Sequence, residues 1–269
     1  MEKISACLVV INEEKLIGRC LESLRGVVDE IILVHDGDCS DKTLVIAKEY
    51  GAKIFVRPFY GVAEGQRPFS YEQASNNWIL QIDADEFLSE ELRSSLRSLA
   101  SNKEISAYEM LWPLWDGKKE IKANWPYKIC LFRKEAISLL GLVHFVVRVK
   151  GKIKKVNLKL KHQPEYSNSS FSYFLKKQSD WAQLQAKKYL QDFSSIPKFN
   201  WTGKDWPESV RYRIKFPLIL IPLEFIWTFL RSLLSGAYRA GWPGVKTSTV
   251  MGIYRASVNY YISKLKYGK

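Results

Sequence analysis

Short apolar segments alternate with amphipathic ones along the first third of the chain. Apolar, largely β-branched runs of strand length cover residues 4–11, 30–34, 52–56 and 78–82. Apolar residues at helical spacing predict helices over residues 16–24, 42–50 and 69–76. Strands and helices that alternate in this way predict an α/β fold, in which a mostly parallel sheet carries helices on both faces.

The second half of the chain has longer helical segments. A long helix is predicted over residues 171–190, and residues 216–230 are the most hydrophobic stretch of the chain. We expect Pro217 and Pro222 to break this stretch, so it falls short of the about 18 to 20 uninterrupted apolar residues that a membrane span needs. The pattern predicts two regions, a domain over residues 1–165 and a basic helical region over residues 166–269.

The two halves of the chain differ in charge. Residues 1–145 carry 18 Lys and Arg against 22 Asp and Glu, whereas residues 146–269 carry 23 against 6. The net charges of −4 and +17 indicate that the second half meets an anionic partner, either nucleic acid or acidic lipids. Cations flank residues 216–230, so we expect helices lying on an anionic membrane surface; the alternative is a core helix packed on the first domain.

Cysteine usage and the N-terminus indicate the compartment. The four cysteines form no C-x-x-C pair, so reduced thiols are expected. The first residues lack the charged, apolar and small-residue sections of a signal peptide. We therefore expect a cytoplasmic protein that is peripheral or monotopic at the inner face of the cell membrane.

Three carboxylates follow the strand predicted over residues 78–82. If the chain stays extended there, Asp83 and Asp85 point to one face and can share one divalent cation. Mg²⁺ or Mn²⁺ held by so few protein ligands completes its shell with phosphate oxygens and water, which indicates a diphosphate ligand. The alternative is a helix N-terminus, where the helix dipole favours Asp and Glu.

Other polar residues also follow predicted strands. Asn12 and Asp36 come after the first two strands, and the carboxyl ends of parallel strands form the ligand-binding edge of such sheets. The chain contains neither G-x-G-x-x-G nor G-x-x-x-x-G-K-[ST], which argues against a dinucleotide-binding protein and a P-loop nucleoside triphosphatase.

Three short motifs occur in order along the first domain. They are Val9-Val10-Ile11-Asn12-Glu13, then Val34-His35-Asp36-Gly37 with Ser40-Asp41-Lys42-Thr43, then Asp83-Ala84-Asp85-Glu86. Together they resemble the signatures of family 2 inverting glycosyltransferases, which have the nucleotide-sugar-binding fold called GT-A. The resemblance covers residues 3–165, which it makes a catalytic domain, and is nearest to the lipopolysaccharide-core and polyprenyl-phosphate type.

The resemblance implies roles for individual residues. It gives the base ring nitrogen to Asp36, the diphosphate or donor sugar to Arg67, and the metal with the diphosphate to Asp83 and the catalytic Asp85. His162, after the last core strand, can reach the metal or the diphosphate. The residues implied to bind the nucleotide sugar are Val10, Asn12, Glu13, Asp36, Arg67, Asp83 and Ala84. The implied cofactor is Mg²⁺ or Mn²⁺.

Two positions depart from the pattern of the family. Ile11 replaces the usual tyrosine, and Phe145 replaces the acid of a Val-His-Glu sequence that can act as general base. The base is therefore His144, Asp116 or Glu109, or no base is needed because the acceptor is already an anion such as a lipid phosphate.

Aromatic residues are dense around a turn predicted at Asp116-Gly117. They can form a platform for a sugar or pack in the core, and they are Trp112, Trp115, Trp125, Tyr127 and Phe132.

The predicted function is that of an inverting glycosyltransferase of EC class 2.4. It moves a sugar from a nucleoside diphosphate donor, with a UDP-sugar favoured, to a lipid-linked or glycolipid acceptor. The alternatives are a nucleotidyltransferase of similar fold, which Asn12-Glu13-Glu14 disfavours because its first loop lacks glycines, and a nucleic-acid-binding protein that uses the basic second half. The sequence gives no indication of the oligomeric state.

Overall fold

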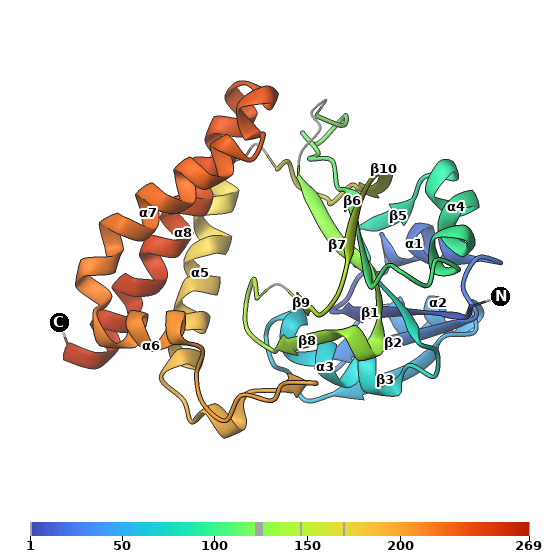
Figure 1. Cartoon of the computed structure of the whole chain (residues 1–269), viewed down its shortest axis with the longest axis horizontal. Coiled ribbons are helices and arrows are strands. Elements are labelled where there is room, and N and C mark those ends of the chain that lie inside the picture. The colour runs from blue at the N-terminus through green and yellow to red at the C-terminus, as the bar shows by residue number, and fades with distance from the viewer. Residues whose placement is uncertain (1, 122–125, 146, 169, 269) are drawn as a thin grey trace. The chain divides into compact units, whose positions relative to one another are not determined.

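The structure is a computed structural model that describes residues 2–121, 126–145, 147–168 and 170–268 (Figure 1). The chain divides into two compact units, Met1–Pro113 with Tyr127–Pro164 and Pro197–Trp201, and Leu114–Pro126 with Glu165–Ile196 and Thr202–Lys269. The chain passes between the units more than once, and the predicted division at residue 165 stays a prediction.

The first unit contains a mixed sheet. Its described strands are β1 (Ile4–Val10), β2 (Glu30–Asp36), β3 (Lys53–Arg57), β4 (Trp78–Gln81), β5 (Glu86–Leu88), β6 (Ala107–Leu111), β7 (Tyr127–Arg133) and β10 (Ile153–His162). They lie in the order β3-β2-β1-β4-β7-β6-β10-β5. The first four are parallel, whereas β7 is antiparallel to both β4 and β6. The predicted α/β fold is confirmed, and the carboxyl ends of β1, β2 and β4 share one edge.

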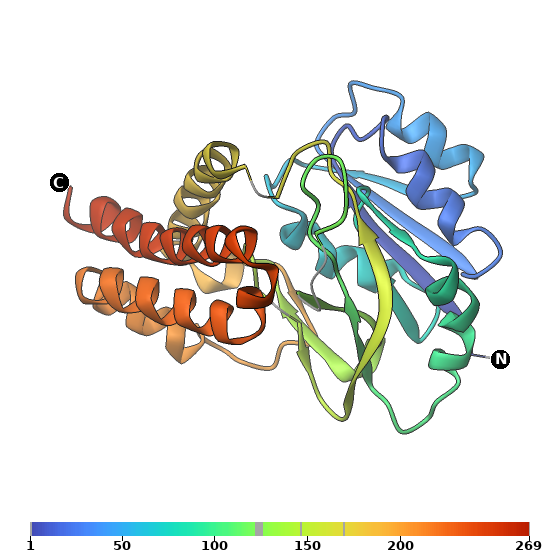
Figure 2. The ribbon, with the colours of Figure 1, turned by 90° about the horizontal axis from the view of Figure 1, so that it is seen from above.

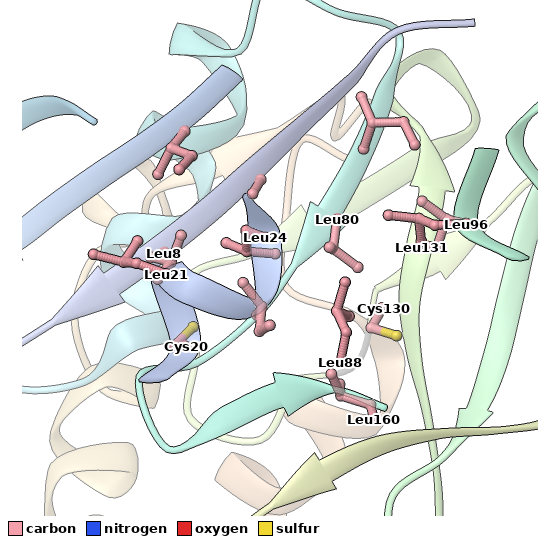
Figure 3. Close-up of a cluster of buried hydrophobic side chains, with 14 of the residues drawn as sticks. Leu8, Cys20, Leu21, Leu24, Leu80, Leu88, Leu96, Cys130, Leu131 and Leu160 are labelled. Carbon is pink, nitrogen blue, oxygen red and sulfur yellow. The ribbon is translucent and has the colours of Figure 1, made fainter. Parts of the chain in front are cut away.

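Helices cover both faces of this sheet because its central strands are apolar on both sides. On β1, Leu8 and Val10 face a core shared with α1 (Ile17–Leu24), α2 (Thr43–Glu49) and α4 (Glu90–Ala100). Figure 3 shows part of this cluster, with Leu21 of α1 and Leu96 of α4 near the strands. Val9 faces the other core, which includes residues of α3 (Ala63–Gln73) and of a small antiparallel sheet. That sheet contains β8 (Ile137–Leu140), β9 (Arg148–Val149) and β11 (Lys198–Phe199).

Helix α3 begins at Ala63, well before the predicted start at residue 69. The predicted start was wrong, because Pro68 lies inside α3 and the helix continues through it. The earlier start places Arg67 on a helix rather than in a loop.

The second unit is helical. Its described helices are α5 (Phe171–Tyr189), α6 (Glu208–Lys215), α7 (Pro217–Leu234) and α8 (Trp242–Tyr267), with short 3-10 turns at Phe193–Ser195 and Ala237–Ala240. Helices α7 and α5 both pack along α8, as Figures 1 and 2 show. The expectation that prolines break residues 216–230 was wrong. Pro217 lies in the first turn, where no backbone N–H is needed, and α7 continues through Pro222.

Candidate active site

The segment after β4 turns instead of staying extended. The N–H of Glu86 donates to the carbonyl of Asp83 at 2.9 Å, and the N–H of Asp83 donates to Oε2 of Glu86 at 2.9 Å. Ala84 and Asp85 occupy this turn. The condition for both aspartates to lie on one face, an extended chain from Asp83 to Asp85, is therefore not met, and Asp83 and Asp85 contact different partners.

Asp83 lies in a cluster of two carboxylates and two cations. Its Oδ1 is 3.0 Å from Nη2 of Arg67 on α3, and its Oδ2 is 2.8 Å from Nζ of Lys128 on β7. The same Lys128 ammonium is 2.6 Å from Oε1 of Glu86, whose side chain is fully buried. Both oxygens of Asp83 are thus neutralised by cations of the chain itself.

The charges in this cluster stabilise one another. Burial disfavours the charged form of Asp83, but Lys128 and Arg67 outweigh it and hold the pKa of that carboxyl well below its usual range. Burial likewise opposes the charge on Lys128, yet Asp83 and Glu86 keep its pKa above the ordinary value. For Glu86 burial is the larger effect, and its pKa is raised despite the contact with Lys128. Asp83 and Lys128 are therefore both charged at neutral pH.

Asp85 pairs with a buried histidine. Its Oδ2 is 3.3 Å from Nε2 of His162, at the end of β10. The imidazole stacks on Trp112 with ring centroids 4.0 Å apart, and the indole N–H of Trp112 donates to Glu86 at 2.5 Å. Trp112, predicted as a sugar platform or a core residue, fixes the ring plane of His162 here. The Nδ1 atom of His162 is buried and has no hydrogen-bond partner within the described structure.

A second basic residue holds the end of β10 against this turn. The N–H of Gln163 donates to the carbonyl of Asp85 at 2.9 Å. Arg19 of α1 donates to the side chain and the carbonyl of Gln163 at 2.6 and 3.1 Å, and its guanidinium lies 4.3 Å from the ring centroid of Phe87. Arg19 thereby fixes the position of His162 relative to Asp85.

The loops after β1 and β2 are joined by hydrogen bonds. Asn12 has a left-handed backbone (φ 48°); its N–H donates to Nε2 of His35 at 3.2 Å, and its Oδ1 accepts from the N–H of Ser40 at 2.9 Å. The N–H of Glu13 donates to Oγ1 of Thr43 at 2.6 Å. The two motifs that carry Asn12 and Ser40 thus form one polar edge.

Asp36 anchors the loop that follows β3. Its side chain is 1% exposed and accepts hydrogen bonds from the N–H groups of Tyr60 and Gly61 at 2.7 and 2.9 Å and from Gln66 at 2.6 Å. Its role toward a nucleotide base stays a prediction. Val10 and Ala84 are buried, so any contact of theirs with a ligand would come from the backbone.

The three candidate bases occupy different places. His144 has a left-handed backbone (φ 53°), is exposed, and donates its N–H to Oε1 of Glu64 at 3.1 Å; this oxygen is 3.8 Å from Arg67. Glu109 lies half-buried on β6. Asp116 belongs to the second unit and accepts the N–H groups of the two residues that follow Gly117, each at 2.8 Å. The predicted turn at Asp116-Gly117 is confirmed.

Comparison with known proteins identifies the chain. The model of glycosyl transferase family 2 matches residues 5–147. The chain belongs to this family. It is therefore a glycosyltransferase of EC class 2.4 with a GT-A fold, and the additional C-terminal helices are present as predicted.

Several relatives of this glycosyltransferase are identifiable. It is 32% identical over 218 residues to an uncharacterized glycosyltransferase of Rickettsia felis, and the match covers 75% of each chain. It is 35% identical over 113 residues to the lipopolysaccharide core biosynthesis glycosyltransferase LpsC of Rhizobium meliloti, covering 40% of this chain and 41% of that one. Glucosyl-3-phosphoglycerate synthase of Mycobacterium tuberculosis, solved with Mn²⁺, UDP and glucosyl-3-phosphoglycerate, is 23% identical with a TM-score of 0.35, covering 41% of this chain and 44% of that one.

The Asp85 and His162 pair of the glycosyltransferase fits a divalent cation. Two ligand atoms that are each about 2.1 Å from one ion and at right angles lie about 3.0 Å apart, close to the 3.3 Å found here. Among the described residues no group of three or more His, Cys, Asp and Glu side chains could hold a metal. An ion at this pair would complete its shell with diphosphate oxygens and water.

Sequence reasoning missed Lys128, Glu86, Arg19 and Glu64 as contributors to the site. Lys128 had a usable signal, because it is a single cation next to the apolar run Ile129-Cys130-Leu131-Phe132 of a strand. Trp125, one of the predicted aromatic platform residues, lies outside the described residues.

Proposed function

We propose that this glycosyltransferase is an inverting, divalent-metal-dependent enzyme that takes its sugar from a nucleoside diphosphate donor. The observation that carries the proposal is the pairing of Asp85 with His162 beside an Asp83 already neutralised by Arg67 and Lys128. One acidic and one imidazole ligand are left facing each other at the ligand-binding edge of the sheet.

We assign a separate role to each residue of the site. Asp85 and His162 would hold Mg²⁺ or Mn²⁺, which supplies positive charge to the leaving diphosphate when bound. Arg67 and Lys128 orient Asp83, and through it the turn that presents Asp85. Trp112 and Arg19 hold His162 and the strand end in place. This preorganisation of charge lowers the barrier without movement at the moment of reaction.

The proposed acceptor is lipid-linked or a glycolipid, reached at the cytoplasmic face of the cell membrane. The similarity to a lipopolysaccharide core glycosyltransferase and the net charge of +17 over residues 146–269 support this acceptor. Phe145, where relatives carry an acid, packs edge-to-face on Trp201 with ring centroids 5.8 Å apart. His144 is the proposed base for a hydroxyl acceptor, and an anionic lipid phosphate needs no base.

Substitution of Asp85 by Asn tests the proposal. A panel of UDP-sugars with Mn²⁺ is incubated with the protein, and release of UDP is measured. The Asp85→Asn variant should lose at least about a hundredfold in rate, because the amide keeps the shape and removes the ligand charge. The exposed Asp205→Asn variant serves as a control and should match the unsubstituted protein. Equal UDP release by Asp85→Asn, or release that is indifferent to chelator, would contradict the proposal.

A further inference from the structure

Helix α7 has its apolar side chains on the outside. Its exposed positions recur every three to four residues along the whole helix, so they form one face. We call these positions the α7 outer face; they are Leu218, Ile219, Pro222, Leu223, Ile226, Trp227, Leu230, Arg231 and Leu234. All except Arg231 are apolar, and Leu223, Trp227 and Leu234 are 54%, 65% and 77% exposed. Such a continuous face is more than the scattered exposed hydrophobic residues of an ordinary surface.

Glu224 and Ser232 of α7 point the other way, into the second unit. Glu224 forms an ion pair with Arg213 of α6 at 2.6 Å, and these two side chains are only 18% and 11% exposed. Eight residues further along, Ser232 accepts a hydrogen bond from Ser248 of α8 at 2.9 Å, with both residues buried. A helix that packs on a water-soluble protein places its polar residues outside, so the polarity of α7 is reversed.

The contact between α7 and α8 is built from small residues. Ser248 and Gly252 of α8 are buried where this helix meets α7, and Gly244, four residues before Ser248, lies against the turn Ala237–Ala240. A Cβ atom at Gly252 would lie 2.9 Å from Cδ2 and 3.0 Å from the carbonyl oxygen of Phe225 on α7, so only glycine allows this approach. Close helix contacts through small residues, joined by hydroxyl groups, are typical of helices whose surroundings are lipid.

The charges around the α7 outer face favour an anionic partner. Residues 202–269 carry 11 Lys and Arg against 3 Asp and Glu. Lys215 before α7, Arg231 in its last turn and Arg239 after it are exposed, and so is Trp242. Acidic lipid headgroups complement this basic rim. A second copy of the chain would bring the same rim against its own and be repelled.

We propose that the α7 outer face lies in the boundary between headgroups and acyl chains of an anionic bilayer, with α7 parallel to the membrane plane. Within the described ranges, α7 is the one helix long and apolar enough to cross a membrane. Its 18 residues span about 27 Å, less than the about 30 Å of a hydrocarbon core. Helix α8 beside it carries Lys246, Arg255 and Asn259, so the two helices do not cross as a pair.

This membrane-bound position of α7 rests on the proposed function, because its role would be to bring the enzyme to a lipid acceptor. Binding to the bilayer itself does not require catalysis, so the two can be tested separately. UDP release from a nucleotide sugar in solution reports on the first unit, and vesicle binding reports on the second. A negative result in one measurement therefore does not change the interpretation of the other.

Flotation of the full chain with vesicles tests the inference. Vesicles of phosphatidylcholine alone are compared with vesicles that also contain phosphatidylglycerol. The unsubstituted chain should float with the anionic vesicles, and a Leu223→Ser, Trp227→Ser double variant should bind at least tenfold more weakly. Val45→Ser, which removes an exposed apolar side chain of α2 in the first unit, is the matched control and should bind unchanged. Circular dichroism and solution UDP release should be the same for all three.

The remaining outcomes would overturn the inference. These are absence of flotation by the unsubstituted chain, flotation of the double variant at full strength, and an apolar-dependent dimer in analytical ultracentrifugation without vesicle binding. Trypsin added outside sealed vesicles should cleave after both Lys215 and Arg239, one at each end of α7. Protection of one end would show a membrane span and would overturn the parallel seating.

Discussion

The two units of the chain distribute polar and apolar side chains in opposite ways. In the first unit, residues such as Leu8 and Leu80 fill the core, and the charges of Asp83 and Asp85 gather where strands end. In the second unit, α7 turns Glu224 inward and exposes Trp227. One unit is arranged as proteins in water are, and the other has a helix that is arranged for apolar surroundings.

The polar contacts of the two units have different roles. In the first unit the ion pairs around Asp83 hold the turn that carries the proposed ligand site. In the second unit the Arg213 and Glu224 pair joins two helices and leaves the outside of α7 free of acidic groups. Substitutions that remove one polar partner at a time measure how strongly each arrangement depends on these contacts.

The largest effect is expected at Lys128. The Lys128→Met variant keeps the apolar stem and removes the ammonium that lies between Asp83 and the fully buried Glu86. An uncompensated buried carboxylate should lower the free energy of unfolding by about 3–5 kcal/mol. Urea unfolding at pH 7, followed by circular dichroism, measures the loss.

Lys152→Met is the matched control for this variant. Lys152 pairs with Glu104 at 3.7 Å in the same unit, but the two side chains are 65% and 80% exposed. An exposed pair of this kind contributes about 0–1 kcal/mol, so this control should unfold close to the unsubstituted protein. Equal unfolding midpoints for Lys128→Met and Lys152→Met would mean that the Asp83 cluster is not a stabilising centre.

The order of the first four strands and the helices between them could be predicted because each of these strands has its own apolar pattern. The contacts of the site could not. Lys128 reaches Asp83 across 45 positions of the sequence, through the insertion of antiparallel β7 beside β4, and no local pattern encodes that pairing. The turn at Ala84 was missed because the hydrogen bonds that close it come from the side chain and N–H of Glu86.

In the second unit, the hydropathy of residues 216–230 predicted an apolar segment correctly, but the prediction of its structure was wrong. The prolines of residues 216–230 were taken as breaks, but one begins α7 and the other is accommodated within it. Which face of α7 is exposed depends on where α8 packs, and that is set by Gly252 and its close approach to Phe225. The regular spacing of small residues in α8 is visible in the sequence, but the sequence does not show which helix packs against them.

A smaller, pH-dependent effect is expected at Glu30, at the start of β2. Burial alone would raise the pKa of Glu30, but contacts with Lys53, Ser5 and Ser75 hold it at about 2. Because the folded pKa lies below the unfolded one, the carboxylate stabilises the fold above about pH 4.5 and loses this effect as the pH falls toward 2. Glu30→Gln should cost about 2 kcal/mol at pH 7, after allowance for the exposure of Lys53.

Urea unfolding of the Glu30→Gln variant between pH 7 and pH 3 gives the test. The difference from the unsubstituted protein should shrink steadily as the pH falls. Glu104→Gln, at an exposed pair of the same unit, should show a difference near zero at every pH. A Glu30→Gln difference that stays constant with pH would assign its effect to packing rather than to charge.

The smallest effect is expected at Ser248. It shows whether the hydroxyl groups or only the small size of the residues hold α7 against α8. Ser248 donates to Ser232 of α7 and lies within reach of the carbonyl of Gly244, each at 2.9 Å. Ser248→Ala keeps the small size that the helix contact needs and removes the hydroxyl, so it should cost about 1 kcal/mol in thermal unfolding. Ser257→Ala is the control, because this residue is less buried on the same helix and should change stability by less than about 0.5 kcal/mol. If Ser248→Ala is as stable as Ser257→Ala, small size alone holds α7 against α8. Ser232 then lies inward because the α7 outer face is apolar apart from Arg231, and not because its hydroxyl stabilises the helix contact.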